Sequence, residues 1–359
     1  MVKLGDICTI VSGSTPKSNI PEYWDGDIKW ITPAELNENS YIIEDSVRHI
    51  TEMGVAKTGL KPFPKGTVIL SSRAPIGKTA IAGCEMYCNQ GFKNLICSNK
   101  IEPRYLYWFL SAKTDYLNSL GRGATFKEIS KEIVASIEIP LPSISGQITI
   151  AERFEKLSEL IALRKEQLAK LDELVKARFV EMFGDPLKND KGLPTVSGEV
   201  LFNLSNGKAL PNSKRFAEGI PAYGGNGISW YTDEILCDYD TIIVGRVGFQ
   251  SGNVHLAKAP LWVTDNAMYI SSINSRDCDI RFLCDLMEHL DFTRYQDAGD
   301  LKKITQKPFM QMQYLMPPMP LQKQYIAFAE QGDKLKLTIQ ASLDKLEVMK
   351  KALMQEYFG

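Results

Sequence analysis

GQITIAERFEKLSELIALRKEQLAKLDELVKARFVEMFG, residues 146–184, is the longest helical pattern in the chain. Its apolar residues are three, four or seven positions apart, a spacing typical of a helix that packs lengthwise on another helix. Only Arg164 interrupts the series. The predicted packing residues are Ile150, Phe154, Leu157, Ile161, Leu168, Leu171 and Val175.

The C-terminal stretch repeats this pattern and ends EYFG where the first ends EMFG. Subtracting 184 from 359 gives an offset of 175 residues, at which Leu168 coincides with Leu343 and Phe183 with Phe358. Matched phase and matched endings indicate an internal duplication rather than two unrelated surface helices. The second set of predicted packing residues is Leu335, Ile339, Leu343, Leu346, Met349 and Leu353.

Each repeat counts about 37 residues, hence roughly 55 Å at 1.5 Å per residue. Each repeat lacks internal glycine or proline for most of its length, with Gly332 near the start of the second repeat as the exception. A helix of this length is too long to pack within one globular core. The two repeats are therefore predicted to pair as a long antiparallel coiled coil that holds two domains apart.

The regions before the two helices also correspond. KGTVILSSRAPIGKTAI (65–81) and DYDTIIVGRVGFQSGNVHL (238–256) both predict a strand, a turn with an arginine and a second strand. This correspondence places Arg73 and Arg246 in equivalent loops. An amphipathic helix and a glycine-containing loop are expected to follow in each half.

These patterns predict an α+β protein of pseudo-twofold symmetry. Its expected parts are two globular domains, residues 1–145 and 185–320, and two long helices, residues 146–184 and 321–359. Each half of the chain is thus a domain followed by a helix.

Two glycine-containing stretches allow a phosphate-binding interpretation. PAYGGNGISWY (221–231) favours a tight turn over a phosphate cradle, because successive glycines usually mark positive φ. Gly77 to Thr79 read GKT after a predicted strand, but the first glycine of a P-loop is replaced by Ser72 and no long helix is expected to follow. ATP binding at this position is therefore disfavoured.

Composition limits the class of protein. With 44% apolar and 24% charged residues the chain is typical of globular proteins, and no run of eighteen apolar residues predicts a membrane span, so a cytoplasmic protein is expected. Seven cysteines without CxxC spacing and three scattered histidines favour free thiols over a metal site. A net charge of −1 predicts weak binding of nucleic acid by the isolated chain.

A proline-rich entry with a glutamine opens each long helix, Gln147 in LPSISGQITIAERF (141–154) and Gln324 in MPLQKQYIAFAEQ (319–331), and KKALMQEYFG closes the second. With two variable domains that each precede a near-identical helix, the chain resembles the specificity subunit of type I restriction-modification systems over its full length.

This resemblance implies that each globular domain is a target-recognition domain that reads one half of a bipartite, asymmetric sequence in double-stranded DNA. The helices would act as spacer and docking surface for two modification (methyltransferase) subunits, and restriction and translocase subunits would join through the complex. S-adenosylmethionine, ATP and Mg are expected on those partners, with no cofactor, catalysis or membrane contact in this chain.

The candidates for DNA contact lie in the loops, because arginine binds guanine bidentately and also binds phosphate. For each of them a solvated surface charge is the alternative. The candidates are Arg73, Lys78, Arg246, Gln250 and Asn253, with Arg122, Lys127, Lys302 and Lys303 in the later loops.

Two other functions stay open on the sequence. The first is a non-catalytic coiled-coil tether whose end domains bind protein, and the second is a nucleotide-dependent enzyme that uses Gly77 to Thr79. A methylation pattern in the host genome would distinguish the specificity subunit from the tether.

Overall fold

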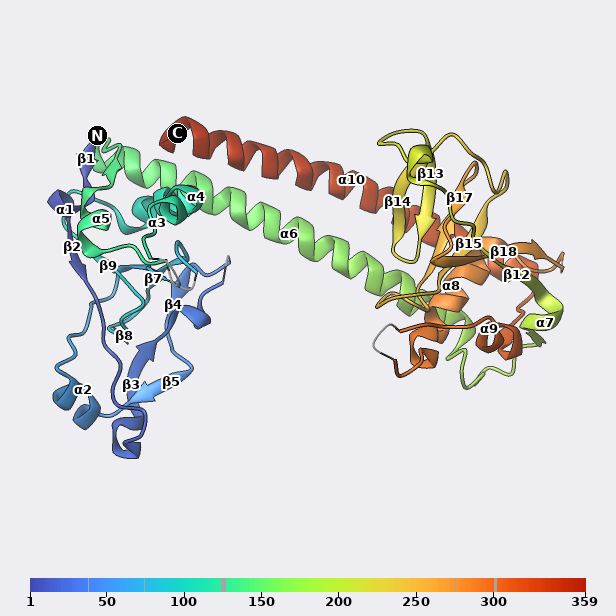
Figure 1. The fold of residues 1–359 in the computed structure, drawn as a ribbon, viewed down its shortest axis with the longest axis horizontal. Helices are drawn as coiled ribbons and strands as arrows, with labels where there is room; N and C mark the ends of the chain where they lie inside the picture. The colour runs from blue at the N-terminus through green and yellow to red at the C-terminus, as the bar shows by residue number, and fades with distance from the viewer. Residues whose placement is uncertain (38, 74, 124–126, 275, 300–301) are drawn as a thin grey trace. The chain divides into compact units, whose positions relative to one another are not determined.

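The computed structural model describes residues 1–37, 39–73, 75–123, 127–274, 276–299 and 302–359. The chain divides into two compact units (Figure 1). Unit 1 comprises Met1–Lys165 and Ala341–Gly359, and unit 2 comprises Glu166–Gln340. Within the described ranges, no helix has both the length and the apolar composition that crossing a membrane requires.

Two helices of 40 residues each, α6 (Ile144–Phe183) and α10 (Met319–Phe358), contribute to both units. Figure 1 draws α6 in green and α10 in red. Both their first and their last residues differ by 175, the offset of the sequence repeat. α6 ends at Phe183, and the φ of +75° at the following Gly184 is a left-handed conformation that glycine adopts without strain. Each helix is about 60 Å long.

The two helices pair in antiparallel fashion within each unit. In unit 1 the early part of α6 meets the end of α10, where the rings of Phe154 and Phe358 stack with centroids 5.7 Å apart. In unit 2 the end of α6 meets the early part of α10, and the ring centroids of Phe179 and Tyr325 are 5.3 Å apart. Aromatic contacts therefore join the helices to each other in both units.

The predicted packing residues of α6 are all buried or half-buried, as are Ile339, Leu343, Leu346 and Leu353 of α10. The prediction was wrong for Leu335 and Met349, which are 54% and 48% exposed. Lys336 and Lys350 take the inward positions instead. Lys336 pairs with Asp172 of α6, and the Lys350 ammonium lies 4.9 Å from the centroid of a Trp108 ring. Long lysine stems cover apolar surface while their charges find partners.

Among its described residues, unit 1 contains three sheets with strand orders β2-β9-β6-β7-β4, β5-β3-β8 and β1-β10. The strands are β1 (Val2–Lys3), β2 (Cys8–Val11), β3 (Trp24–Ile31), β4 (Ile42–Ile43), β5 (Arg48–Ile50), β6 (Val68–Leu70), β7 (Thr79–Ala82), β8 (Tyr87–Cys88), β9 (Asn94–Cys97) and β10 (Glu138–Ile139). The shorter helices are α1 (Leu4–Ile7), α2 (Glu52–Thr58), α3 (Pro103–Ala112), α4 (Thr114–Ser119) and α5 (Lys131–Ser136).

The described part of unit 2 also contains three sheets, with orders β12-β18-β15-β16, β14-β13-β17 and β11-β19. The strands are β11 (Thr195–Ser197), β12 (Phe202–Asn206), β13 (Ile220–Gly224), β14 (Gly227–Thr232), β15 (Thr241–Gly245), β16 (Val254–Ala257), β17 (Trp262–Val263), β18 (Ala267–Ile273) and β19 (Gln313–Leu315). The shorter helices are α7 (Gly198–Leu201), α8 (Ile280–Leu290) and α9 (Lys307–Gln311).

The two units repeat one topology. β2-β9-β6-β7 corresponds to β12-β18-β15-β16, and β5-β3-β8 corresponds to β14-β13-β17, with β4 as an addition in unit 1. Both three-stranded sheets contain one parallel pair, β3 with β8 and β13 with β17. The duplication seen in the helices thus continues through the globular parts.

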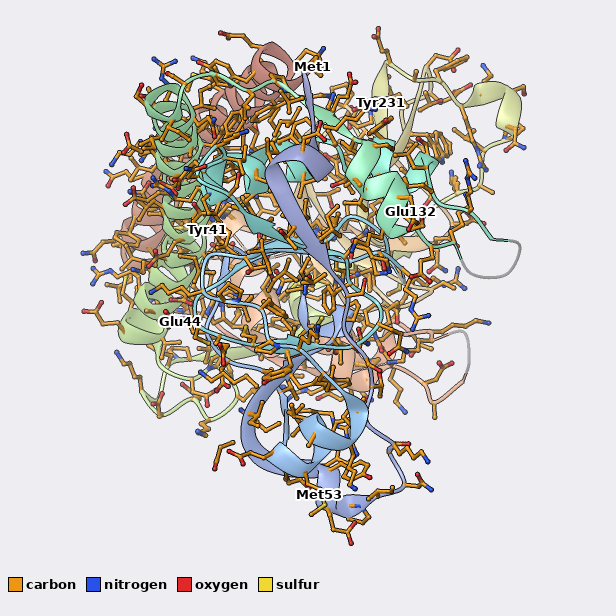
Figure 2. The ribbon with its side chains drawn as sticks, turned by 90° about the vertical axis from the view of Figure 1, so that its left-hand side faces the viewer. Met1, Tyr41, Glu44, Met53, Glu132 and Tyr231 are labelled. Carbon is orange, nitrogen blue, oxygen red and sulfur yellow. The ribbon has the colours of Figure 1, made fainter. Side chains whose placement is uncertain are left out.

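Aromatic residues fix each sheet layer to the long helices. In unit 1, Trp108 of α3 stacks on Phe154 of α6 with ring centroids 5.3 Å apart. Tyr41, labelled in Figure 2, donates a hydrogen bond from its hydroxyl to Glu155 of the same helix. In unit 2, Phe282 of α8 stacks on Phe179 of α6 at 5.8 Å. In each unit, the helix that follows the largest sheet therefore packs on α6.

One glutamine at the entry of each long helix is fully buried. Gln147 accepts from the Glu102 N–H (2.8 Å) and donates to the carbonyls of Lys100 (3.1 Å) and Pro142 (2.9 Å). The residue that does this in α10 is Gln322 rather than Gln324, the glutamine quoted in the sequence motif.

Gln322 accepts from the Asp279 N–H (2.9 Å) and donates to the carbonyls of Asp277 and Pro317 (both 2.7 Å). It lies 175 residues after Gln147, the offset of the repeat, whereas Gln324 is exposed. A fully buried side chain at each helix entry therefore ties the helix to the loop before α3 or α8.

The glycine-containing stretches form turns. Gly224 pairs with Gly227, whose φ is +94°, so residues 221–231 are the β13–β14 hairpin and the turn interpretation is confirmed. Gly77 also has a φ of +94°, and Thr79 begins strand β7 rather than a helix. The GKT sequence therefore lacks the helix N-terminus on which a P-loop holds phosphate.

Candidate nucleic-acid interface

Two loops meet at one edge of unit 1. They are the Arg73 loop (residues 71–78) and the Arg122 loop (residues 121–130), of which residues 74 and 124–126 lie outside the described part. The Ile129 N–H donates to the Ser72 carbonyl at 3.0 Å, and Arg122 and Glu128 exchange two backbone hydrogen bonds of 3.0 Å. Backbone pairing thus brings the two predicted basic loops together.

Glu128 connects the side chains of these loops. Its carboxylate lies 2.9 Å from Lys93 Nζ and 3.8 Å from an Arg73 guanidinium nitrogen. Burial favours the neutral acid, but the hydrogen bond and charge of Lys93, followed by Arg73 and Ser72, lower the pKa of Glu128. Arg73 is therefore oriented by a charged neighbour, while Arg122 and Lys127 are exposed.

Lys78 serves the fold of its own loop. Its ammonium donates to the carbonyls of Leu36 and of Pro33, the latter at 3.4 Å. These bonds tie residues 33–36 to the Arg73 loop. Lys78, a predicted DNA-contact residue, thus binds main-chain carbonyls of residues 33–36 in the structure.

Unit 2 has the corresponding pair, the Arg246 loop (residues 245–253) and the Lys302 loop (residues 297–304, with 300 and 301 outside the described part). The Ile304 N–H donates to the Arg246 carbonyl at 3.0 Å, and the Gly248 N–H donates to the Lys302 carbonyl at 2.8 Å. Lys302 and Lys303 are exposed and Arg246 is half-exposed. All three predicted cations of this unit therefore lie on two joined loops.

Polar side chains complete the Arg246 loop. The Arg246 guanidinium donates to the Asp265 carbonyl at 3.2 Å. Asn253 donates from its side-chain amide to the side-chain oxygen of Gln250. Guanidinium, ammonium and amide groups at one edge can contact phosphates and base edges together.

Arg73 and Arg246 lie in equivalent loops at positions one residue apart. The Ser72 N–H donates to the Gly91 carbonyl at 2.8 Å, and the Arg246 N–H donates to the Asn266 carbonyl, 175 residues later, at 2.9 Å. Arg246 thus corresponds to Ser72 by its backbone contacts. The loop of unit 2 also contains one residue more between its paired ends, Gly245 and Asn253, than the loop of unit 1 between Ser71 and Lys78.

The sequence did not show two features of the candidate interface. Lys93 is 8% exposed in a strand region, and no pattern distinguishes its buried amine from a surface lysine. Phe249 is 81% exposed at the tip of the Arg246 loop, and the Lys302 ammonium lies 5.6 Å from its ring centroid. For Phe249, the sequence offered one signal: an aromatic residue directly between Gly248 and Gln250, in a predicted turn.

Unit 2 also has a polar cavity of about 370 Å³ beside α8. Cys284, Asp285 and Glu288, which lie within it, place potential metal-ligand atoms within 4.8 Å of one another. Asp285 already accepts from Arg281 at 3.1 Å and from the Tyr325 hydroxyl at 2.9 Å. These bonds commit the Asp285 carboxylate to linking α8 with α10.

Residues 1–173 match the family model described as type I restriction modification DNA specificity domain. Two solved structures share the fold of the chain. The S subunit of a type I restriction-modification system from M. genitalium aligns at a TM-score of 0.62 with 17% identity, over 99% of this chain and 95% of that one. A chain from a structure of the type I R-M system aligns at 0.65 with 18% identity, over 99% and 96%.

Curated relatives carry the same description. The type I restriction enzyme MjaIX specificity subunit of Methanocaldococcus jannaschii is 41% identical over 194 residues, 53% of this chain and 45% of that protein. The EcoprrI specificity subunit of Escherichia coli is 23% identical over 354 residues, 92% of this chain and 87% of that protein. The chain thus spans less than half of the first relative and most of the second. By its matched domain, its relatives and its fold, the chain is similar to type I restriction-modification specificity subunits.

Proposed function

We propose that this chain selects the DNA target of a type I restriction-modification complex, with each globular domain reading one half of a bipartite, asymmetric sequence. The observation that carries the proposal is the repetition of one loop pair in two units, Ser72 with Ile129 and Arg246 with Ile304. Two copies of one framework with different loop residues suit two different half-sites.

In this proposal the recognition domains are residues 1–145 and 185–320, related by a pseudo-twofold axis. Residues 146–184 and 321–359 form the coiled coil that spaces the domains and docks two modification subunits. Exposed apolar residues on these helices support docking, because burial of apolar surface stabilises protein association. They include Leu163, Leu174, Leu337 and Val348.

In this proposal the chain itself is non-catalytic. Its partner subunits would carry S-adenosylmethionine, ATP and Mg, together with methyl transfer, translocation and cleavage. The net charge of −1 supports dependence on partners, because neutralisation of phosphates provides most non-specific affinity for DNA. The chain then contributes target choice within a larger basic surface.

Binding measurements test this division of roles. By fluorescence anisotropy, the purified full chain should bind duplex DNA weakly and with little sequence preference, and addition of its modification subunit should produce tight binding to one target. Methyl transfer or ATP hydrolysis by the chain alone would contradict the proposal. A complex that assembles and shows no sequence preference would support the tether with protein-binding end domains.

A further inference from the structure

Phe249 is the most exposed aromatic side chain on the joined loops of unit 2. It keeps 81% of its surface in contact with solvent, although its loop neighbours Val247, Gly248 and Gln250 are only partly exposed. Removing a phenylalanine ring from water is favourable, so a partner that covers it gains affinity. An isolated exposed phenylalanine needs no explanation, but this one lies among the cations of the candidate interface.

The loop holds this ring on a supported backbone. The Gly248 N–H donates to the Lys302 carbonyl at 2.8 Å, and the Ser251 N–H donates to the Gly248 carbonyl at 3.0 Å. The side-chain amide of Gln296 donates to the carbonyls of Phe249 (3.3 Å) and Ser251 (2.6 Å). Residues on both sides of Phe249 are therefore fixed from outside the loop, which lowers the entropy cost of presenting the ring to a ligand.

The charges around the ring favour nucleic acid as its partner. The Lys302 ammonium lies 5.6 Å from the ring centroid, and the backbone of Lys303 pairs with that of Val247. Arg246 lies three residues before Phe249 on the same loop. Aromatic rings among cations are the arrangement with which proteins bind bases while their cations bind the backbone.

A phenylalanine ring has no hydrogen-bond donor or charge to offer a phosphate. Its gain on DNA must come from apolar surface, which means a thymine methyl group or the face of a base exposed at an opened step. We propose that Phe249 is a specificity-determining residue that makes apolar contact with the bases of the half-site read by unit 2. This inference rests on the proposed DNA-reading function and adds the residue and chemistry of one contact.

Substitution of Phe249 in the full chain, assembled with its modification subunit, tests the contact. The duplex should carry the sequence that the complex methylates. On this duplex, Phe249→Ala should weaken binding about tenfold, the effect of one lost base contact. Binding to non-target duplex and its dependence on salt should stay unchanged, because the cations remain. Phe249→Leu keeps an apolar side chain and should recover part of the loss.

Val200→Ala is the matched control, since Val200 is 65% exposed on α7 of the same unit. It should leave target binding unchanged. Thermal unfolding of each variant should match that of the native chain, because both side chains lie at the surface.

Modified duplexes distinguish the two base surfaces. If the ring meets a thymine methyl group, replacing that thymine by deoxyuridine should weaken the native complex as much as Phe249→Ala, with no further loss when both changes are combined. If the ring enters an opened step, 2-aminopurine beside that step should brighten with the native complex and not with Phe249→Ala.

Three results would overturn the inference. They are native-like target binding by Phe249→Ala, equal losses on target and non-target DNA, and loss of assembly with the modification subunit, which would make Phe249 a protein contact. Failure of the proposed function is distinguishable, because then the native complex would itself show no preference for any duplex.

Discussion

Arg246 tests whether one loop reads one half-site. Its guanidinium donates a hydrogen bond to the Asp265 carbonyl at 3.2 Å. Among the described residues it pairs with no carboxylate, so its charge is available to DNA. Arg246→Ala should cost roughly 1–3 kcal/mol of binding and relax base choice in one half-site. Arg73→Ala is the matched variant and should affect the other half-site. Binding selections on randomised half-sites measure both, and equal losses in both halves from either variant would indicate misfolding or phosphate contact.

Glu128 is expected to stabilise unit 1 through Lys93. Lys93 is 8% exposed, and its ammonium lies 2.9 Å from the Glu128 carboxylate. Glu128→Ala should reduce the free energy of unfolding by about 1–3 kcal/mol, because it leaves a buried cation unpaired. Because the Glu128 pKa is lowered from its ordinary 4.5, its contribution is present at neutral pH and is lost as the pH falls below that value.

Denaturant unfolding at pH 7 and at acid pH measures this contribution. Glu138→Ala, the loss of an exposed carboxylate in the same unit, is the control and should cost little. Adding Lys93→Met to Glu128→Ala removes the unpaired charge and should recover most of the loss. No recovery in the double variant would show that Lys93 is not the partner through which Glu128 acts.

At the scale of elements, the entry glutamines give a matched pair of variants. Gln322→Ala removes three hydrogen bonds with main-chain atoms from a fully buried site and leaves the Asp279 N–H and two carbonyls without this partner. We expect a loss of about 1–3 kcal/mol in unfolding free energy. Gln324→Ala, on the exposed side of the same helix, should change stability by less than about 0.5 kcal/mol. A larger effect from Gln324 would contradict the assignment of the buried residue.

The long helices were predictable from the sequence, and some of their details were not. Periodicity predicted helices over 146–184 and 321–359, within two residues of α6 and α10. It misplaced Leu335 and Met349, because hydrophobicity alone cannot show that the stems of Lys336 and Lys350 pack inward. The sequence motif named Gln324, whereas the 175-residue offset from Gln147 selects Gln322, the buried residue.

The candidate site was predictable as loops rather than as side chains. Strand patterns located the loops of Arg73 and Arg246, and the structure joins each to the later basic loop of its unit. The two loops differ in length by one residue, so their residues could not be aligned correctly without the backbone hydrogen bonds. Lys78 is engaged by carbonyls from residues distant in sequence, which a single sequence does not show.

For the whole molecule, we expect the continuous helices to set the spacing of the half-sites. Insertion of one matched heptad into each, near Leu168 and Leu343, keeps the apolar seam in register and adds about 10 Å. That length equals roughly three base pairs at 3.4 Å each. The tolerated spacer should lengthen by about three pairs with both half-sites unchanged. An insertion in α6 alone is the control, since it breaks the matched length and should reduce activity. Full activity with an unaltered spacer would contradict this role of the helices.

The most direct measurement of the central claim is a genome-wide map of methylated bases in cells that carry this chain and its modification subunit, compared with cells that lack the chain. Two repeated units that read separately predict one bipartite, asymmetric motif, with two different half-sites at a fixed number of unread base pairs. Methylation at this motif should disappear without the chain. A map that is identical with and without the chain, or a single continuous motif, would contradict the account.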